Sequence, residues 1–178
     1  GALDPLSDQA AANIESWLDG AGEPAGGRVV EIILQDADPD ELTLRPIGVV
    51  RNELRRGVSA PRARAPRSVI ELRPELAEGL DGLAPGQDLV IVFAFHQSAG
   101  PAPLRQHRQG DPQEPLLGVF SLRSPHRPNP LGLTTVRVLE VEGNRLVVAG
   151  LDAYDGTPVL DIKPYVAWLD APQAAQEE

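Results

Sequence analysis

The fold class of this chain is decided by residues 133–151, which read LTTVRVLEVEGNRLVVAGL. Two runs rich in valine and leucine, 133–141 and 145–151, flank the dipeptide Gly143-Asn144. A short link of this kind between two apolar runs is typical of a tight β-hairpin. We therefore expect two antiparallel strands that are neighbours in a sheet.

The other apolar runs extend this β pattern along the chain. We expect strands at 28–34, 42–51, 69–72, 88–95, 116–122 and 158–166, and a single helical turn at 74–80. Pro46 indicates an edge position or a bulge. Residues 55–68 and 98–115 show no hydrophobic period and are expected to be long loops. Because strands dominate and most links are of hairpin length, we predict a mainly β fold, a compact antiparallel β-barrel with long loops and a short N-terminal helix.

Residues 1–41 are expected to form an acidic N-terminal extension. Ser7 can cap a helix that runs through Leu18 and ends at Gly20. A linker rich in Gly, Pro and Ala follows at 19–27 and leads to the strand at 28–34. The barrel domain is then predicted over 42–170, with a tail at 171–178.

Charge is distributed unevenly along the chain. The formal net charge is −10, and residues 1–44 hold ten acidic side chains against one arginine, Arg28. Residues 45–73 hold eight arginines against Glu53 and Glu71. This segment suits a nucleic-acid phosphate backbone, and it equally suits a solvated arginine-rich surface. Both interpretations stay open.

Composition excludes several classes of site. The chain has no cysteine, which excludes disulfides, thiolate metal sites and cysteine nucleophiles. His96, His107 and His126 lack the close spacing of metal ligands, so no metal is expected. No apolar run approaches the roughly 20 residues of a membrane span, and no signal-peptide pattern appears. We expect a cytoplasmic protein with no membrane partner.

A proline-rich stretch at 121–133, SLRSPHRPNPLGL, carries the densest set of polar groups. Proline fixes φ and removes a donor, so this stretch cannot continue a helix or a central strand. A rigid loop loses little entropy when it orders around a ligand. We interpret it as a stiff platform that presents Arg123, Arg127 and Asn129 to an anionic or hydrogen-bonding ligand.

A second motif lies at 152–165 and reads DAYDGTPVLDIKPY. Asp155-Gly156 is a turn signal, and the motif predicts a hairpin followed by a strand. It also gathers three aspartates, two tyrosines and Lys163, the only lysine of the chain.

With these two motifs, and more weakly with Phe93-Ala94-Phe95-His96, the chain resembles the TsaA/TrmO family, also called YaeB-like or VirR-like. The resemblance runs from about Arg45 to Asp170. It implies an S-adenosylmethionine-dependent methyltransferase that acts on tRNA. It also implies a β-barrel in place of the Rossmann fold, in agreement with the absence of a G-x-G-x-x-G pattern. The resemblance further implies that the protein works as a homodimer, with the cofactor near the subunit interface.

The resemblance implies site residues as well. The cofactor is expected at Pro61, Arg62, His96, Gln97, Arg123, Leu133, Asp155, Gly156, Thr157 and Pro158. Arg127, Asn129 and Lys163 are candidates for substrate contact, and Asn129, Asp161, Lys163 and Tyr165 are candidates for the catalytic groups. Leu133 can instead be a core residue of its strand, and Asp161 can instead form a structural ion pair with Lys163 or an arginine.

Three departures from the family pattern bear on the substrate. The chain has Ala63 after Pro61-Arg62 where a glutamine is usual, Asn52-Glu53 where a Ser-Pro pair is common, and Gln97 after His96 where an arginine is common. The function expected from the resemblance is methylation of the threonylcarbamoyladenosine beside the anticodon, at the exocyclic nitrogen of adenine. Methylation of another RNA or a small molecule, and a non-catalytic ligand- or nucleic-acid-binding barrel, remain alternatives.

Overall fold

The computed structural model describes residues 42–55, 67–98 and 100–172. The expected helix that begins near Ser7, the linker at 19–27 and the strand at 28–34 lie outside the described residues. Pro61, Arg62 and Ala63 lie outside them as well. No helix in the described part of the chain is long and apolar enough to cross a membrane.

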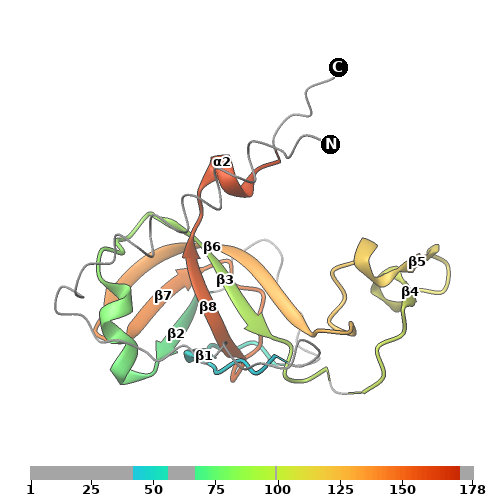
Figure 1. Ribbon diagram of the computed structural model, residues 1–178, viewed down its shortest axis with the longest axis horizontal. Coiled ribbons are helices and arrows are strands. Elements are labelled where there is room, and N and C mark those ends of the chain that lie inside the picture. Colours follow the sequence, from blue (N-terminus) through green and yellow to red (C-terminus); the bar gives the residue numbers. More distant parts are fainter. Residues whose placement is uncertain (1–41, 56–66, 99, 173–178) are drawn as a thin grey trace, which may run out of the picture. The chain divides into compact units, whose positions relative to one another are not determined.

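Six strands close into an antiparallel barrel (Figure 1), and the predicted fold class is confirmed. Their order around the barrel is β1-β2-β7-β6-β3-β8, and every neighbouring pair is antiparallel. The strands are β1 (Gly48–Arg51), β2 (Arg67–Leu72), β3 (Asp88–Ala94), β6 (Leu131–Glu142), β7 (Arg145–Ala149) and β8 (Pro158–Pro164). A 3-10 helix, η1 (Pro74–Leu80), occupies the predicted helical turn, and a short helix, α2 (Ala167–Asp170), follows β8.

The barrel interior is filled by alternate side chains, as the period of a strand requires. On β3, Leu89, Ile91 and Phe93 are buried while the residues between them are partly exposed. Buried valine, leucine and isoleucine side chains from the other five strands meet them in one cluster. Continuous closure leaves these strands without a free edge, which removes the usual template for aggregation.

The predicted hairpin at Gly143-Asn144 is confirmed. Glu142 pairs with Arg145 across a two-residue link, and Gly143 takes φ 56° at the first central position. A positive φ at that position alone is the requirement of a type II′ turn, which matches the twist of the flanking strands. Asn144 then donates its side-chain N–H to the carbonyl of Leu72 at 2.6 Å, so the turn is fastened to β2.

The turn at Asp155-Gly156 does not make a hairpin. Thr157 N–H donates to the Tyr154 carbonyl at 3.1 Å, and Gly156 has φ 80°, so the turn itself is present. The strands on either side of it are not neighbours, because β7 pairs with β2 and β6 whereas β8 pairs with β1 and β3. The hairpin prediction was therefore wrong, and the link 150–157 crosses the end of the barrel instead.

The first strand is shorter than the run 42–51 predicted. β1 begins at Gly48, after Pro46, whose nitrogen has no hydrogen to give to a ladder. Ile47 still donates to Val159 and accepts from Arg73, so pairing ends one residue after the proline.

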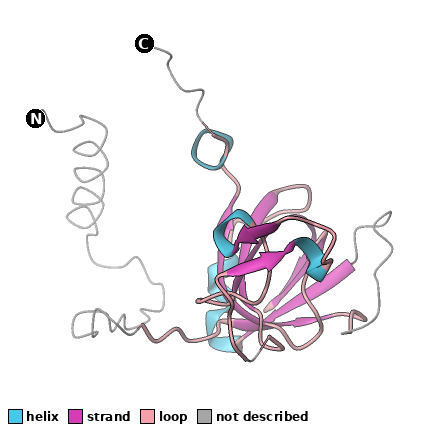
Figure 2. Cartoon of the chain, turned by 90° about the vertical axis from the view of Figure 1, so that its right-hand side faces the viewer, coloured by secondary structure: helices cyan, strands magenta, loops and turns pink. Residues whose placement is uncertain are grey.

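Residues 100–130 form a separate feature, here called the lobe. It contains β4 (Arg105–His107) paired with β5 (Leu116–Gly118), and the 3-10 turns η2 (Arg108–Gly110) and η3 (Val119–Ser121). Figure 2 views the molecule from the lobe's side, with the barrel behind it. The strand predicted over 116–122 stops at Gly118, and the loop predicted over 98–115 contains β4. Both strands have only three residues, too few to show a period in the sequence.

Candidate functional site

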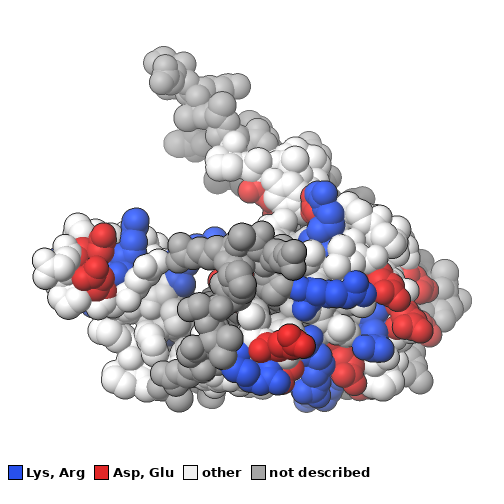
Figure 3. All heavy atoms as spheres, turned by 180° about the vertical axis from the view of Figure 1, so that it is seen from behind, with Lys and Arg blue, Asp and Glu red and all other residues white. Residues whose placement is uncertain are grey.

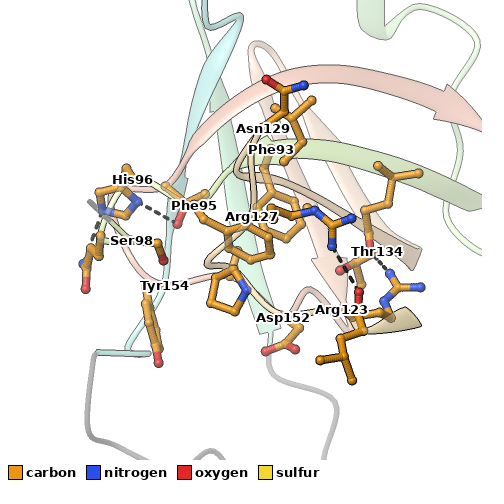
Figure 4. A pocket seen from close by; sticks show the side chains of 18 of the residues that line it. Phe93, Phe95, His96, Ser98, Arg123, Arg127, Asn129, Thr134, Asp152 and Tyr154 are labelled. Atoms are coloured by element: carbon orange, nitrogen blue, oxygen red, sulfur yellow. Dashed lines mark hydrogen bonds between the residues drawn. The ribbon is translucent and has the colours of Figure 1, made fainter. Parts of the chain in front are cut away.

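A pocket of about 880 Å³ opens where the lobe meets one end of the barrel (Figure 4). This volume lies in the range of about 300–1,000 Å³ that is usual for small-molecule sites. Four segments line it: the end of β3 and the residues after it, 93–98; the lobe and its exit, 120–131; the start of β6, 132–134; and the link 152–157 between β7 and β8.

His96 stands at the rim of the pocket, just beyond β3. Its Nδ1 lies 3.3 Å from the Oγ1 of the buried Thr157, and its Nε2 lies 3.2 Å from the amide nitrogen of Gln97. The imidazole is thus held between the side chains of Thr157 and Gln97, which fix the orientation of the ring.

Two arginines enter the pocket from the proline-rich stretch. Arg123 donates to the carbonyl of Leu133, and Arg127 donates to the carbonyl of Leu122 at 3.2 Å. Each of these bonds uses one N–H of a guanidinium that has five. Neither arginine has a carboxylate partner among the described residues. The remaining donors are thus available to an anionic ligand.

Aromatic rings form the apolar wall. Phe93 and Phe95 meet edge to face with centroids 5.4 Å apart. Gly132 lies opposite Phe93 in the register of β3 and β6, and a Cβ added there would come within 2.5 Å of the Phe93 ring. The ring position therefore depends on this glycine, since no other residue leaves that space.

The acidic end of the turn is tied to β1. Asp155 accepts the backbone N–H of Asn52 at 3.0 Å and forms an ion pair with Arg55 at 3.3 Å. The side chain of Asn52 donates to Ser68 and to the carbonyl of Ala153, both at 2.9 Å. Asn52, one of the departures from the family pattern, therefore braces the link that lines the pocket.

The expected cofactor residues are brought together in part. The residues His96, Gln97, Arg123, Leu133 and Thr157 line the pocket, and of the expected substrate residues Arg127 and Asn129 do so. Leu133 is half exposed there and is not a core residue. The pocket lining does not include Asp155, Gly156 or Pro158. Gly156 nevertheless faces the His96 ring, because a Cβ added to this glycine would lie 3.9 Å from Nε2 of His96. The roles of all these residues stay predictions.

Three candidate catalytic residues lie elsewhere on β8 and beyond. Asp161 and Lys163 form an ion pair of 2.7 Å, and Tyr165 donates its backbone N–H to Asp88 at the far end of β3. None of the three lines the pocket. The alternative of a structural Asp161–Lys163 pair is the one that the contacts support.

Sequence reasoning left Asp152 and Tyr154 out of the site, although both belong to the second motif and line the pocket. One signal was present in the alternation of Leu151, Asp152 and Ala153. Leu151 and Ala153 are buried, which turns the side chain between them away from the core.

Comparisons with known proteins agree with this geometry. Residues 55–171 match the tRNA-methyltransferase O N-terminal domain. The chain belongs to this family. The resemblance drawn from the two motifs is therefore confirmed.

Individual relatives support the assignment. A probable S-adenosyl-L-methionine-binding protein of Pyrococcus horikoshii is 45% identical over 107 residues, covering 58% of this chain and 76% of the relative. Another, of Methanocaldococcus jannaschii, is 36% identical over 133 residues, covering 73% and 97%. A crystal structure of TrmO from Pseudomonas aeruginosa superposes with a TM-score of 0.60 at 37% identity and covers 76% of this chain. The chain spans 61% of that TrmO structure.

Proposed function

We propose that this chain is a methyltransferase that binds S-adenosyl-L-methionine in the pocket between the lobe and the barrel. The observation that carries the proposal is the pocket itself. There, one aspartate and two arginines that have no carboxylate partner in the described part of the chain lie around an aromatic wall. The cofactor offers a carboxylate, two cationic centres and a flat base. Guanidinium donors suit the carboxylate, and apolar walls with a few placed polar groups suit the rest. Relatives that are named for this cofactor support the same assignment.

The bound cofactor supplies an electrophilic methyl group on a sulfonium. This chain's part is to hold both reactants in line, since positioning provides much of the rate of such a displacement. Arg123 and Arg127 anchor an anionic end, and Phe93 and Phe95 exclude water from one side. The side-chain oxygen of Asn129 is suited to accept the N–H of an acceptor nitrogen and to orient it. The proton that leaves this nitrogen goes to a weak base or to water.

We propose tRNA as the acceptor, at the exocyclic nitrogen of the threonylcarbamoyladenosine beside the anticodon. The family description supports the tRNA class, and the charge pattern supports a polyanion. Within 45–73, Arg51, Arg55, Arg67 and Arg73 each have a carboxylate within 4 Å, and on the barrel face in Figure 3 basic and acidic side chains lie next to one another. The arginines without a carboxylate partner in the described part of the chain are Arg45, Arg145 and the lobe's Arg105, Arg108, Arg123 and Arg127.

This pattern favours the lobe, which also lines the pocket, over the described arginines of 45–73 as the phosphate-binding surface. A tRNA substrate also fits the expectation of a cytoplasmic protein.

We further propose a twofold homodimer in which each site uses residues of the neighbouring copy. The lobe exposes 79% of Phe120 and 64% of Leu104, and Phe120 lines the open pocket. Exposed apolar clusters beside a ligand site are typical of an interface. Light scattering at micromolar concentration, together with a cofactor titration of the same sample, tests this assembly. A dimer at the concentration where the cofactor binds supports shared sites, and a monomer that binds the cofactor fully contradicts them.

Two measurements test the function. Calorimetry with S-adenosyl-L-methionine and with its demethylated product is expected to give micromolar dissociation constants, about −8 kcal/mol. Mass spectrometry of tRNA nucleosides from a strain lacking the protein is expected to show loss of one methylated adenosine derivative. Binding without any change in tRNA nucleosides would leave the cofactor assignment and reject tRNA. Absence of binding to either compound would reject the methyltransferase.

A further inference from the structure

Among the described residues that line the pocket, Asp152 carries the one carboxylate. The pocket's other charged or titratable side chains, among the described residues that line it, are Arg123, Arg127, His96 and Tyr154. In the view of Figure 4, the Asp152 carboxylate lies between Tyr154 and the two guanidinium groups. The pocket thus presents positive groups on the lobe and one negative group on the link between β7 and β8.

Asp152 is placed firmly by its neighbours. Leu151 is fully buried and Ala153 is 6% exposed, and the Ala153 carbonyl accepts the side-chain N–H of Asn52 at 2.9 Å. Two residues on, Asp155 donates its backbone N–H to Leu54 at 3.0 Å. The backbone on both sides of Asp152 is therefore held to the barrel, and its exposed side chain lines the pocket from there.

This carboxylate has no partner in the described part of the chain. Three other aspartates of the barrel and its links have one: Asp88 pairs with Arg137, Asp155 with Arg55 and Asp161 with Lys163. The two arginines of the same pocket donate to backbone carbonyls and not to Asp152. Opposite charges thus face one cavity without neutralising each other, which suits a ligand that carries both signs.

We propose that Asp152 is a binding residue for the positive centre of the ligand, opposite the arginines that take its carboxylate. The inference rests on the proposed function, because S-adenosyl-L-methionine carries a cationic ammonium and a cationic sulfonium. An aspartate in hydrogen-bonding contact with an ammonium forms a charge-assisted bond, and beside a sulfonium it acts as a counter-charge. Either contact makes the pocket select a cationic ligand over a neutral one of similar shape.

The experiment compares wild type, Asp152→Asn and Asp81→Asn by calorimetry. Asparagine keeps the shape of aspartate and removes its charge. Asp81 is an exposed carboxylate on the turn after η1, outside the pocket, and serves as the matched control. Each protein is titrated with S-adenosyl-L-methionine, with its demethylated product, which keeps the ammonium, and with 5′-methylthioadenosine, which has neither cationic centre. Melting curves check that all three proteins are folded.

Asp152→Asn is expected to weaken S-adenosyl-L-methionine binding by roughly tenfold to a hundredfold, the usual effect of losing one charge-assisted bond. Binding of 5′-methylthioadenosine is expected to stay unchanged, as are all affinities of Asp81→Asn. An equal loss for the demethylated product assigns the contact to the ammonium, and an unchanged affinity for that product assigns it to the sulfonium. An Asp152→Asn protein that binds all three compounds like wild type, or loses all three equally, overturns the inference. A wild type that binds none of them overturns the proposed function together with it.

Discussion

The barrel and the lobe use charge and packing in opposite ways. On the barrel wall, arginines are matched by carboxylates on neighbouring strands, as in Arg51 with Glu71 and Arg137 with Asp88. The lobe's four arginines have no carboxylate partner among the described residues. Of the described residues of the lobe, Val119 is the only buried hydrophobic one. Most described arginines of the barrel strands are therefore paired, with Arg145 on β7 the exception, whereas all four arginines of the lobe are left to something that binds.

The lobe is held by polar contacts in place of a core. Gln106 donates to the carbonyls of Pro103 and His126, and accepts from Ser124 at 2.6 Å. This one side chain joins β4 to the proline-rich stretch that carries Arg123 and Arg127. Changes in the barrel should consequently act on stability, and changes in the lobe should act on ligand binding.

The largest effect is expected at the barrel core. Ile91 is fully buried at the centre of β3, and Ile91→Ala removes apolar contacts and leaves a cavity. We expect a loss of about 2–5 kcal/mol in the free energy of unfolding, measured by denaturant titration. Leu139→Ala, on the outward face of β6, is the control and should lose far less. Equal losses at the two positions would contradict a single interior core.

In the lobe, Arg123→Ala should reverse this pattern. Loss of its charge-assisted bond should weaken S-adenosyl-L-methionine binding by roughly 1.5–3 kcal/mol in calorimetry. Its melting temperature should change little, because the side chain is exposed and donates to a single carbonyl. The matched control is Arg67→Ala, an exposed barrel arginine, which should leave cofactor affinity as it was. A large drop in melting temperature for Arg123→Ala would show that the arginine serves the fold instead.

Gly132 lies where the two regions meet, and Gly132→Ala should affect both properties. The added Cβ would overlap the Phe93 ring and also come within 2.9 Å of Phe95. Overpacking of this kind costs about 1–3 kcal/mol of stability, and the displaced rings would also alter the pocket wall. Denaturant titration and calorimetry on one sample measure the two effects. Gly79→Ala, in open space on η1, is the control. If the cofactor affinity of Gly132→Ala is unchanged, Phe93 and Phe95 do not contribute to cofactor binding.

The contrast also explains what the sequence could predict. The barrel strands carry strong apolar signals, so they were predictable from the sequence. β3 is a continuous apolar run, and the apolar runs of β6 and β7 flank the Gly143-Asn144 turn. The lobe's strands are too short to show a period, and β4 consists of Arg105, Gln106 and His107. The proline-rich stretch was still recognisable from composition, since three prolines within six residues cannot continue a helix interior or a central strand.

The partner choice of the link 150–157 was not predictable. The Asp155-Gly156 pattern predicts a turn but does not predict whether the strands before and after it pair with each other. Closure of the barrel places β8 between β1 and β3 instead of beside β7. Asp152 was overlooked for a related reason. Its importance comes from Arg123 and Arg127, which precede it by 29 and 25 residues and which only the closed fold brings to the same cavity.

The smallest effect is expected at a barrel ion pair that faces solvent. Asp88 and Arg137 lie opposite each other in the register of β3 and β6 and form two hydrogen bonds of 2.7 Å. The hydrogen bonds from Arg137 lower the pKa of Asp88 below its ordinary value of 3.8, and they raise the pKa of Arg137. Because the folded-state pKa of Asp88 is lowered, its stabilising contribution is present above pH 3.8 and is lost as the pH falls through the folded value.

Asp88→Asn should therefore melt slightly below wild type at neutral pH, and the difference should shrink as the solution is acidified below the ordinary pKa. Both side chains are exposed, so about 1 M salt should reduce the difference at neutral pH as well. Cofactor affinity should not change, because the pair lies at the end of β3 away from the pocket. Melting curves across the acid range at low and high salt measure this. A difference that stays constant with pH would assign the effect to packing, and a change in cofactor affinity would break the separation between barrel charges and lobe charges.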